Sequence, residues 1–290
     1  MELINKDCFD AFATMKDKSV DMFLLDLPFN CTALKWDKDI IDLEKMWVEI
    51  KRTMKPNAII VMFCTAKFGY RLIHSNPKWF RYDLIWKKSK KVGFLSANKM
   101  PLRQHENIYV FKDKQGTYNP QKTEGKPYNK TNTGNNNKDS CAYGEIDRSS
   151  HLEGEGNRKI NTGDRHPTSI IEDKFLNCQT VYRSAGQKKL HRVKENKDEK
   201  HPTSIIEQEL ENTVLEFNNP SKSIHKTQKP VELCEWLIRT YTNENDVVCD
   251  FTMGSGTVGV ACINTKRQFI GVEKDEEIFT LAKNRINEFK

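Results

Sequence analysis

The sequence predicts a layered α/β fold whose two halves are separated by a long polar insert. Strand-like and helix-like patterns alternate over residues 1–111 and again over residues 213–290. Such alternation is typical of a mostly parallel sheet covered by helices. Residues 112–212 are rich in Asn, Lys, Gly, Ser and Glu and show little apolar periodicity. A chain of 290 residues fits one large domain carrying such an insert.

The first half combines apolar runs with helical stripes. The segments VDMFLLD (20–26) and NAIIVMF (57–63) are continuous apolar runs, typical of buried parallel strands. Residues 42–56 carry apolar side chains at a helical spacing, which predicts an amphipathic helix. A second helix is expected over 66–76, and further strands over 1–7, 81–88 and 105–113.

The second half repeats this texture after the insert. A helix is expected over 229–242, because Pro230 is well placed near a first helical turn. Strands are expected over 212–217, 246–251 and 268–275, and further helices over 256–267 and 276–289.

The insert contains one repeated sequence segment. RHPTSIIE (165–172) recurs as KHPTSIIE (200–207), which indicates a local duplication rather than a solenoid, since two copies do not make a repeat array. The sequence assigns it no function. A separate basic run, WKKSKK (86–91), fits a phosphate contact and a solvated strand end equally well.

Composition limits the partners and the compartment. The net charge of +7 and a pI near 8.8 favour a polyanionic partner. Eight cysteines include no C-x-x-C pair and no zinc spacing, so we expect free thiols in a reducing cytoplasm and no metal. We expect no signal peptide and no membrane span, because the N-terminus lacks an apolar h-region and no run reaches about 18 apolar residues.

Two strand ends carry the first functional signals. LLDLPFN (24–30) ends an apolar run on a carboxylate, a proline and an aromatic ring, although Asp and Pro are also common at ordinary strand ends. In DFTMGSGT (250–257) a buried strand enters a glycine turn that opens a helix, where the backbone can approach an anionic ligand closely. Glu273 follows Asp250 by 23 residues, a spacing that suits a carboxylate binding ribose hydroxyls.

These signals indicate a nucleoside-containing cofactor without identifying it. Gly254, Gly256 and Gly259 satisfy G-x-G-x-x-G, a pattern that a nicotinamide oxidoreductase would also show. A third segment, HKTQKPVEL (225–233), would by itself be a polar loop preceding a helix.

The order of these motifs resembles the beta-class amino-group (N6-adenine or N4-cytosine) DNA methyltransferases. Their pattern is D-P-P-Y or D-P-P-F, a target recognition region, H-P-T-Q-K-P and then F-x-G-x-G; DLPF, HKTQKP and DFTMGSG follow it here. GFLSANKMPLRQHENIYVF (93–111) and TYNPQ (117–121) also look like this family. Two departures occur: Leu27 replaces the first proline, and Lys226 replaces the proline of H-P-T-Q-K-P.

The resemblance implies a circularly permuted Rossmann-like sheet that binds S-adenosyl-L-methionine. Residues 1–111 and 213–290 would be the N- and C-terminal parts of the catalytic domain, and residues 112–212 the inserted target recognition region. The N-terminal strand would then follow the final helix in space. Lys and Arg of the insert would contact phosphates, while its Asn and Gln would read adenine edges.

The resemblance also implies the site residues. Cofactor-binding positions would be Asp7, Cys8, Lys226, Thr227, Gln228, Lys229, Pro230, Asp250, Phe251, Gly254, Ser255, Gly256, Thr257 and Glu273. Catalytic positions would be Asp26, Leu27, Pro28 and Phe29. Asp26 and the Leu27 carbonyl, held by Pro28, would accept hydrogens from the amino group of a flipped base that stacks on Phe29.

The expected activity is site-specific N6 methylation of adenine in double-stranded DNA, as in restriction-modification systems. Aspartate rather than serine at position 26 favours adenine by analogy with the family. N4-cytosine methylation and a catalytically inactive DNA-binding relative remain the alternatives. A homodimer is among the expected assemblies, because dimerisation is common in that family.

Overall fold

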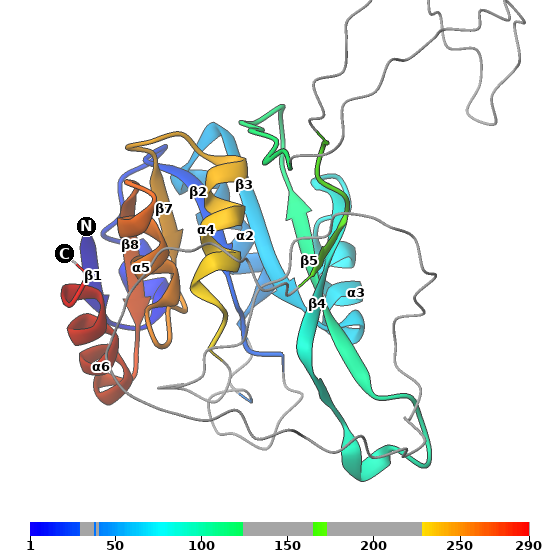
Figure 1. The fold of residues 1–290 in the computed structure, drawn as a ribbon. Helices are drawn as coiled ribbons and strands as arrows, with labels where there is room; N and C mark the ends of the chain where they lie inside the picture. Colours follow the sequence, from blue (N-terminus) through cyan, green and yellow to red (C-terminus); the bar gives the residue numbers. More distant parts are fainter. Residues whose placement is uncertain (30–37, 39–40, 124–164, 173–227, 290) are drawn as a thin grey trace, which may run out of the picture. The chain divides into compact units, whose positions relative to one another are not determined.

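The computed structural model describes residues 1–29, 38, 41–123, 165–172 and 228–289 (Figure 1). The predicted strand over 212–217, the second HPTSIIE copy and the site candidates Lys226 and Thr227 lie outside the described residues. The chain forms two compact units: Met1–Gln121 with Thr168–Lys290, and Lys122–Pro167. In the smaller unit, the backbones of Thr123 and Arg165 pair in an antiparallel bridge. The domain boundaries given above stay a prediction.

The larger unit is built on a mixed sheet. Its described strands lie in the order β1-β8-β7-β2-β3-β5-β4-β6 (Figure 1). Their bounds are Glu2–Asn5 (β1), Val20–Leu25 (β2), Met54–Cys64 (β3), Phe80–Val92 (β4), Arg103–Phe111 (β5), Ile170–Glu172 (β6), Val247–Asp250 (β7) and Gln268–Glu273 (β8).

The strand pairings confirm the predicted permuted α/β sheet. Strand β1 pairs in parallel with β8, with Glu2 opposite Ile270, so the chain's first strand lies beside its last. Strands β8, β7, β2 and β3 continue the parallel part, and β5 runs antiparallel to both β3 and β4. Because β2 and β7 are parallel neighbours, the segments that follow them leave the sheet at the same edge.

Helices cover both faces of this sheet. The apolar side chains of α4 (Val231–Tyr241), α5 (Thr257–Asn264) and α6 (Glu276–Asn287) pack into one core. Those of α1 (Cys8–Phe12), α2 (Leu43–Thr53) and α3 (Ala66–Ser75) pack into the other. Figure 1 shows α4 in front of the central strands. No helix of the described residues is long and apolar enough to cross a bilayer.

Several boundaries differ from those that the sequence predicts. Met54, expected on the helical stripe of 42–56, begins β3 instead, because the helix ends at Thr53. The five-residue helix α1 and the three-residue strand β6 were not predicted, since both are shorter than a periodic pattern needs. Strand β6 is formed by the first HPTSIIE copy and pairs with β4, with Ile171 opposite Trp86.

One glycine sets the distance between α5 and α6. A Cβ on Gly259 would lie 2.6 Å from Ile286 Cδ1 and 2.9 Å from Phe269 Cε1, both in buried side chains. A larger residue would therefore push α6 away from α5 and from β8.

We predict that Gly259→Val lowers the free energy of unfolding by about 1–3 kcal/mol, because overpacking outweighs the gain from replacing a helical glycine. Urea unfolding followed by circular dichroism measures the change. Thr280→Val on exposed α6 surface is the control and should shift stability by less than about 0.5 kcal/mol. A Gly259→Val protein as stable as the wild type would contradict this packing.

Candidate active site

A cavity opens where β2, β7 and β8 end. Its volume is about 790 Å³, within the range of small-molecule sites. It is lined by Asp26 and Pro28 just after β2, by Asp250 at the end of β7 with the turn that follows (Phe251, Thr252, Met253, Gly254, Ser255), and by Glu273 at the end of β8. Segments from the first 30 and the last 50 residues of the chain therefore line the same cavity.

The end of β2 sends its side chains in different directions. Asp26 and Pro28 line the cavity, whereas the Leu27 side chain is 2 % exposed and packs in the core under α1, α2 and α3. The ring of Phe29 lies 5.2 Å from that of Phe68, centroid to centroid. Burial of Leu27 fixes the backbone of this turn, so its carbonyl and the Asp26 carboxylate keep a defined orientation.

The turn after β7 has the backbone that its glycines predict. Gly254 and Gly256 have φ of +48° and +74°, values that favour glycine. A Cβ on Gly254 would meet, among the described residues, nothing nearer than Thr252 O at 4.0 Å, so the backbone there borders open space. The Thr252 hydroxyl lies 3.5 Å from the Asp26 carbonyl oxygen, which places this turn directly beside the end of β2.

Two carboxylates shape the turn. Glu273 accepts hydrogen bonds from Gly254 N (3.1 Å) and Asp275 N (3.0 Å), so it spans the start of the turn and the start of α6. Asp250 accepts a hydrogen bond from Thr252 N at 3.0 Å. Burial raises the pKa of Asp250 to about 8, and burial also raises the pKa of Glu273. Asp250 is therefore substantially protonated at neutral pH.

The remaining predicted site residues are divided between the cavity and its surroundings. Asp7 and Cys8 line it, and Asp7 also caps α1 by accepting a hydrogen bond from Phe9 N at 2.9 Å. Gln228 and Lys229 line it from the segment before α4. Leu27, Phe29, Pro230 and Gly256 do not reach its wall in the described residues; Pro230 begins α4 as its N-cap.

The ammonium group of Lys229 is bonded to the carboxylate of Asp26. The Nζ–Oδ2 distance is 2.5 Å, and Lys229 is 11 % exposed against 30 % for Asp26. Lys229 Nζ also lies 3.2 Å from Glu106 Oε1 on β5, without the geometry of a hydrogen bond. The other carboxylate oxygen of Glu106 pairs with Lys88 on β4. Charges thus alternate in a chain from Lys88 through Glu106 and Lys229 to Asp26.

Each member of this chain sets the protonation of its neighbour. Burial raises the pKa of Asp26, and Lys229 opposes that effect. Burial acts in the same direction on Glu106, but Lys229 and Lys88 outweigh it and lower its pKa. Burial alone would lower the pKa of Lys229, yet Asp26 and Glu106 raise it. Lys229 is thus the cation shared between two carboxylates, those of Asp26 and Glu106.

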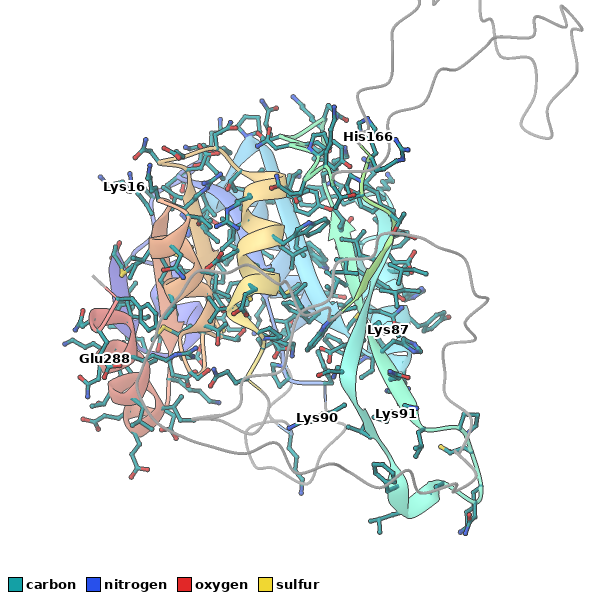
Figure 2. The ribbon with its side chains drawn as sticks, in the orientation of Figure 1. Lys16, Lys87, Lys90, Lys91, His166 and Glu288 are labelled. Atoms are coloured by element: carbon teal, nitrogen blue, oxygen red, sulfur yellow. The ribbon has the colours of Figure 1, made fainter. Side chains whose placement is uncertain are left out.

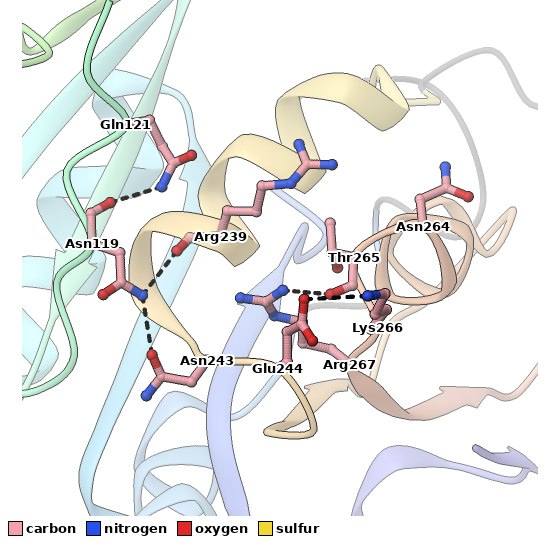
Figure 3. A pocket seen from close by; sticks show the side chains of 9 residues that line it. All are labelled: Asn119, Gln121, Arg239, Asn243, Glu244, Asn264, Thr265, Lys266 and Arg267. Carbon is pink, nitrogen blue, oxygen red and sulfur yellow. Dashed lines mark hydrogen bonds and ion pairs between the residues drawn. The ribbon is translucent and has the colours of Figure 1, made fainter.

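A second pocket lies near the end of α4, and its polar side chains are hydrogen-bonded to the surrounding backbone. It has a volume of about 470 Å³ and is lined around the end of α4 and the turn before β8 (Figure 3). Arg267 donates to the Thr242 and Thr265 backbone carbonyls, and Asn119 donates to the Arg239 carbonyl at 3.2 Å. These bonds join segments of the fold, so we assign this pocket no catalytic role.

Comparison with known proteins identifies the family. The family model for DNA methylases of the N6/N4 type matches residues 20–284. The chain belongs to the N6/N4 DNA methylase family. It is similar to the Type II methyltransferase M1.MboII of Moraxella bovis, 24% identical over 297 residues that cover 98% of this chain and 95% of that protein. It is 43% identical over 63 residues to M2.LlaDCHI of Lactococcus lactis subsp. cremoris, covering 22% and 23% of the two chains.

Solved structures of this family share the fold. The M1.HpyAVI–SAM complex matches with a TM-score of 0.56 and 20% identity, covering 99% of this chain and 98% of that one. The PvuII cytosine-N4-specific methyltransferase matches with a TM-score of 0.55 and 12% identity, covering 99% and 90%. The chain is thus a DNA methyltransferase of the N6/N4 amino-methyltransferase family, and its cofactor is S-adenosylmethionine. This result rejects the nicotinamide interpretation of the glycine spacing.

The residues that line the cavity suit S-adenosylmethionine. A left-handed glycine turn gives the close backbone approach, and Glu273 lies at the adjoining strand end. The described residues contain no cluster of His, Cys, Asp and Glu that could hold a metal ion.

Sequence reasoning missed Glu106, the central member of the charge chain. Glu106 lies two residues before Ile108 and four before Val110 along β5, so it shares a strand face with these two fully buried side chains. This period-2 pattern places a carboxylate on the buried face of a strand, where it needs a cationic partner. Other cavity residues that the sequence did not single out include Lys6, Phe9, Phe63, Cys234, Lys274 and Ile278.

We predict that Asp250→Asn flattens the pH dependence of stability. Because the folded-state pKa of Asp250 is raised to about 8, its contribution lowers the free energy of unfolding as pH rises from about 4 to 8. The slope of one such group is at most about 1.4 kcal/mol per pH unit. Asparagine keeps an acceptor for Thr252 N but does not titrate.

Urea unfolding at pH 5.5, 7.0 and 8.5 measures this difference between variant and wild type. Asp17→Asn, an exposed aspartate whose partner is the surface residue Arg52, is the control. Parallel pH profiles for Asp250→Asn and wild type would show that Asp250 is ionised in the folded protein.

Proposed function

We propose that this chain is a DNA adenine-N6 methyltransferase that acts on double-stranded DNA. The observation that carries the proposal is the shared cavity. The Asp26 carboxylate, the Gly254 turn and Glu273 face one volume of about 790 Å³. A cofactor held by the turn and a base held by Asp26 would therefore meet without any rearrangement of the sheet.

The end of β2 prepares the amino group for reaction. Bound S-adenosylmethionine supplies a methyl group on a positively charged sulfur. An exocyclic amino group is a weak nucleophile because its lone pair is delocalised into the ring. Asp26 and the Leu27 carbonyl each accept a hydrogen bond from the amino group, which favours a pyramidal nitrogen, and Asp26 takes the proton that the nitrogen loses when it gains the methyl group. Because burial raises the pKa of Asp26, this carboxylate is also a stronger base than an exposed aspartate.

Lys229 holds Asp26 until the base arrives. Its ammonium occupies one oxygen of the acceptor that the base needs, at 2.5 Å. Glu106 Oε1 lies 3.2 Å from the same ammonium and accepts no hydrogen bond from the described residues. The base takes over Asp26 while Lys229 turns to Glu106. The Asp26 carboxylate thus exchanges its cation for a hydrogen bond from the amino group, while Lys229 stays paired with Glu106, and both changes limit the cost of desolvation.

Adenine is the proposed target because position 26 is aspartate. In the resembling enzymes, aspartate before the Pro-Pro-aromatic motif favours adenine and serine favours cytosine. The adenine has to leave the duplex to reach this cavity. Phe29 packs against Phe68 outside the cavity wall, so its ring would have to turn toward the cavity to stack on the flipped base. The insert 112–212 would read the sequence around that base. The homodimer, the restriction partner and the cytoplasmic location stay predictions.

Cofactor contacts are proposed for the residues of the cavity wall. Asp250, Phe251, Gly254, Ser255 and Thr257 border the turn, and Glu273 would bind ribose hydroxyls. Asp7, Cys8 and Gln228 complete the wall from other segments.

We predict that Asp26→Ala and Glu273→Ala fail in different ways. Asp26→Ala should reduce methyl transfer to DNA by about 10²–10⁴-fold, as expected for loss of a catalytic proton acceptor, while S-adenosylmethionine still binds. Glu273→Ala should weaken cofactor binding about tenfold or more, because a charged hydrogen bond is worth about 1.5–3 kcal/mol. Calorimetric titration and transfer of a labelled methyl group to DNA measure the two effects.

The product identifies the base. Mass spectrometry of nucleosides from methylated DNA should show N6-methyladenine. N4-methylcytosine would establish the cytosine alternative instead. Equal incorporation by Asp26→Ala and wild type would overturn the catalytic assignment, and absence of transfer by the wild type on DNA of varied sequence would favour an inactive relative.

A further inference from the structure

The β4–β5 hairpin projects beyond the sheet at the edge where the cavity opens. Asn107 of β5 pairs with Cys64, the last residue of β3, on one side and with Ile85 of β4 on the other. Beyond that level β4 still pairs with β6 as far as Lys87. Past Lys87, among the described residues, β4 and β5 pair with each other alone and continue to Val92 and Arg103. Figure 1 shows this two-stranded ribbon extending past the other strands, on the side from which α4 begins.

The ribbon is strongly cationic. Residues 85–105 contain no Asp or Glu and carry six cations: Lys87, Lys88, Lys90, Lys91, Lys99 and Arg103. Between the pairs Lys87–His105 and Val92–Arg103, β4 has four residues where β5 has one, so the lysine run bulges out of the ladder. Lys88 turns inward to Glu106, whereas Lys90 and Arg103 are exposed. Figure 2 shows Lys90 and Lys91 near the edge at which the ribbon projects.

The tip of the ribbon is apolar and exposed. Gly93, with φ of +98°, turns the chain into a short 3₁₀ helix, Phe94–Ser96. Phe94 and Leu95 are 67 % and 104 % exposed, and Met100 is 61 % exposed. Large exposed apolar side chains that are grouped together and flanked by cations are typical of an interaction surface.

We propose that this ribbon lies in the major groove of the substrate duplex, beside the base that enters the cavity. The inference rests on the proposed function, because it takes DNA as the substrate. A major groove about 12 Å wide admits a two-stranded β-ribbon. In that position Lys90, Lys91 and Arg103 contact the phosphates on the groove walls, and Phe94 and Leu95 contact base edges such as thymine methyl groups.

The charge and the place of the ribbon both select DNA as the occupant. The ribbon carries six cations against one carboxylate, the buried Glu106 that pairs with Lys88, so it is complementary to a polyanion, and a second copy of the same ribbon would repel it. The duplex must also stand at the carboxyl edge of the sheet, because Asp26 receives the flipped base there. The ribbon therefore supplies DNA contacts in addition to those expected of the insert 112–212.

The test compares two pairs of lysines. Lys90→Ala with Lys91→Ala removes charge from the ribbon, whereas Lys16→Ala with Lys51→Ala removes the same charge at the opposite edge, where Lys16 lies (Figure 2) and α2 ends. Fluorescence anisotropy with a labelled 24-base-pair duplex of mixed sequence gives Kd over a salt series. The ribbon pair should reduce the slope of log K against log salt by about 2, because each lost phosphate contact removes about 0.9. The control pair should leave the slope unchanged.

The tip is tested separately. Phe94→Ser with Leu95→Ser should raise Kd at least fivefold with an unchanged salt slope, since these side chains carry no charge. Light scattering of the same variant detects any role in self-association. Unchanged DNA binding by both hairpin variants, or a dimer that becomes a monomer on tip mutation with DNA affinity intact, would overturn the proposal.

Failure of the proposed function would look different. If the wild type binds DNA but transfers no methyl group, the adenine methyltransferase proposal fails while the salt slopes still decide the role of the ribbon. If the wild type methylates DNA and the ribbon pair keeps the wild-type slope, only the ribbon proposal fails.

Discussion

The ion pair between Lys229 and Asp26 is the interaction on which the active site depends. It joins the segment before α4 to the end of β2, with 2.5 Å between Nζ and Oδ2. Glu106 on β5 lies 3.2 Å from the same ammonium and is its second carboxylate neighbour. Without Lys229, two carboxylates would face each other in a mostly buried place. The same ammonium thus offsets the burial of Asp26, the carboxylate that the proposed function assigns to the target base.

The sheet order explains why this pair can lie beside a cofactor site. Strands β2 and β7 are parallel neighbours, so Asp26 and the Gly254 turn leave the sheet at one edge, and the Thr252 hydroxyl comes within 3.5 Å of the Asp26 carbonyl. The charge chain extends from that edge to Lys88 at the base of the β4–β5 hairpin. The proposed catalytic carboxylate follows β2, the glycine turn follows the neighbouring strand β7, and the proposed DNA ribbon is formed by β4 and β5, with β3 between β2 and β5 in the same sheet.

Much of this arrangement could be predicted from the sequence, because apolar runs locate buried strands and parallel strands place their ends together. The glycine turn and DLPF were found in this way, and their order indicated the family. The partner of the Lys229 side chain could not be predicted: Lys229 lines the cavity, where its role as a cofactor contact stays a prediction, and its ammonium is bonded to Asp26. Strand β6 depends on pairing between Ile171 and Trp86, residues far apart in the sequence, and three residues give no periodic signal. The position of Glu106 on the buried face of its strand could be predicted from its two-residue spacing to Ile108 and Val110. Its role could not, because the sequence does not show that Lys88 and Lys229 are its partners.

The pH dependence of single-turnover methyl transfer by Lys229→Met tests the role of the ion pair most directly. Burial raises the pKa of Asp26 and Lys229 opposes it, so removal of the ammonium should move the acid limb of the rate profile to higher pH and slow transfer at neutral pH. Lys229→Arg should restore much of the wild-type profile, because it keeps the charge. A Lys229→Met protein with the rate and the pH profile of the wild type would contradict the account.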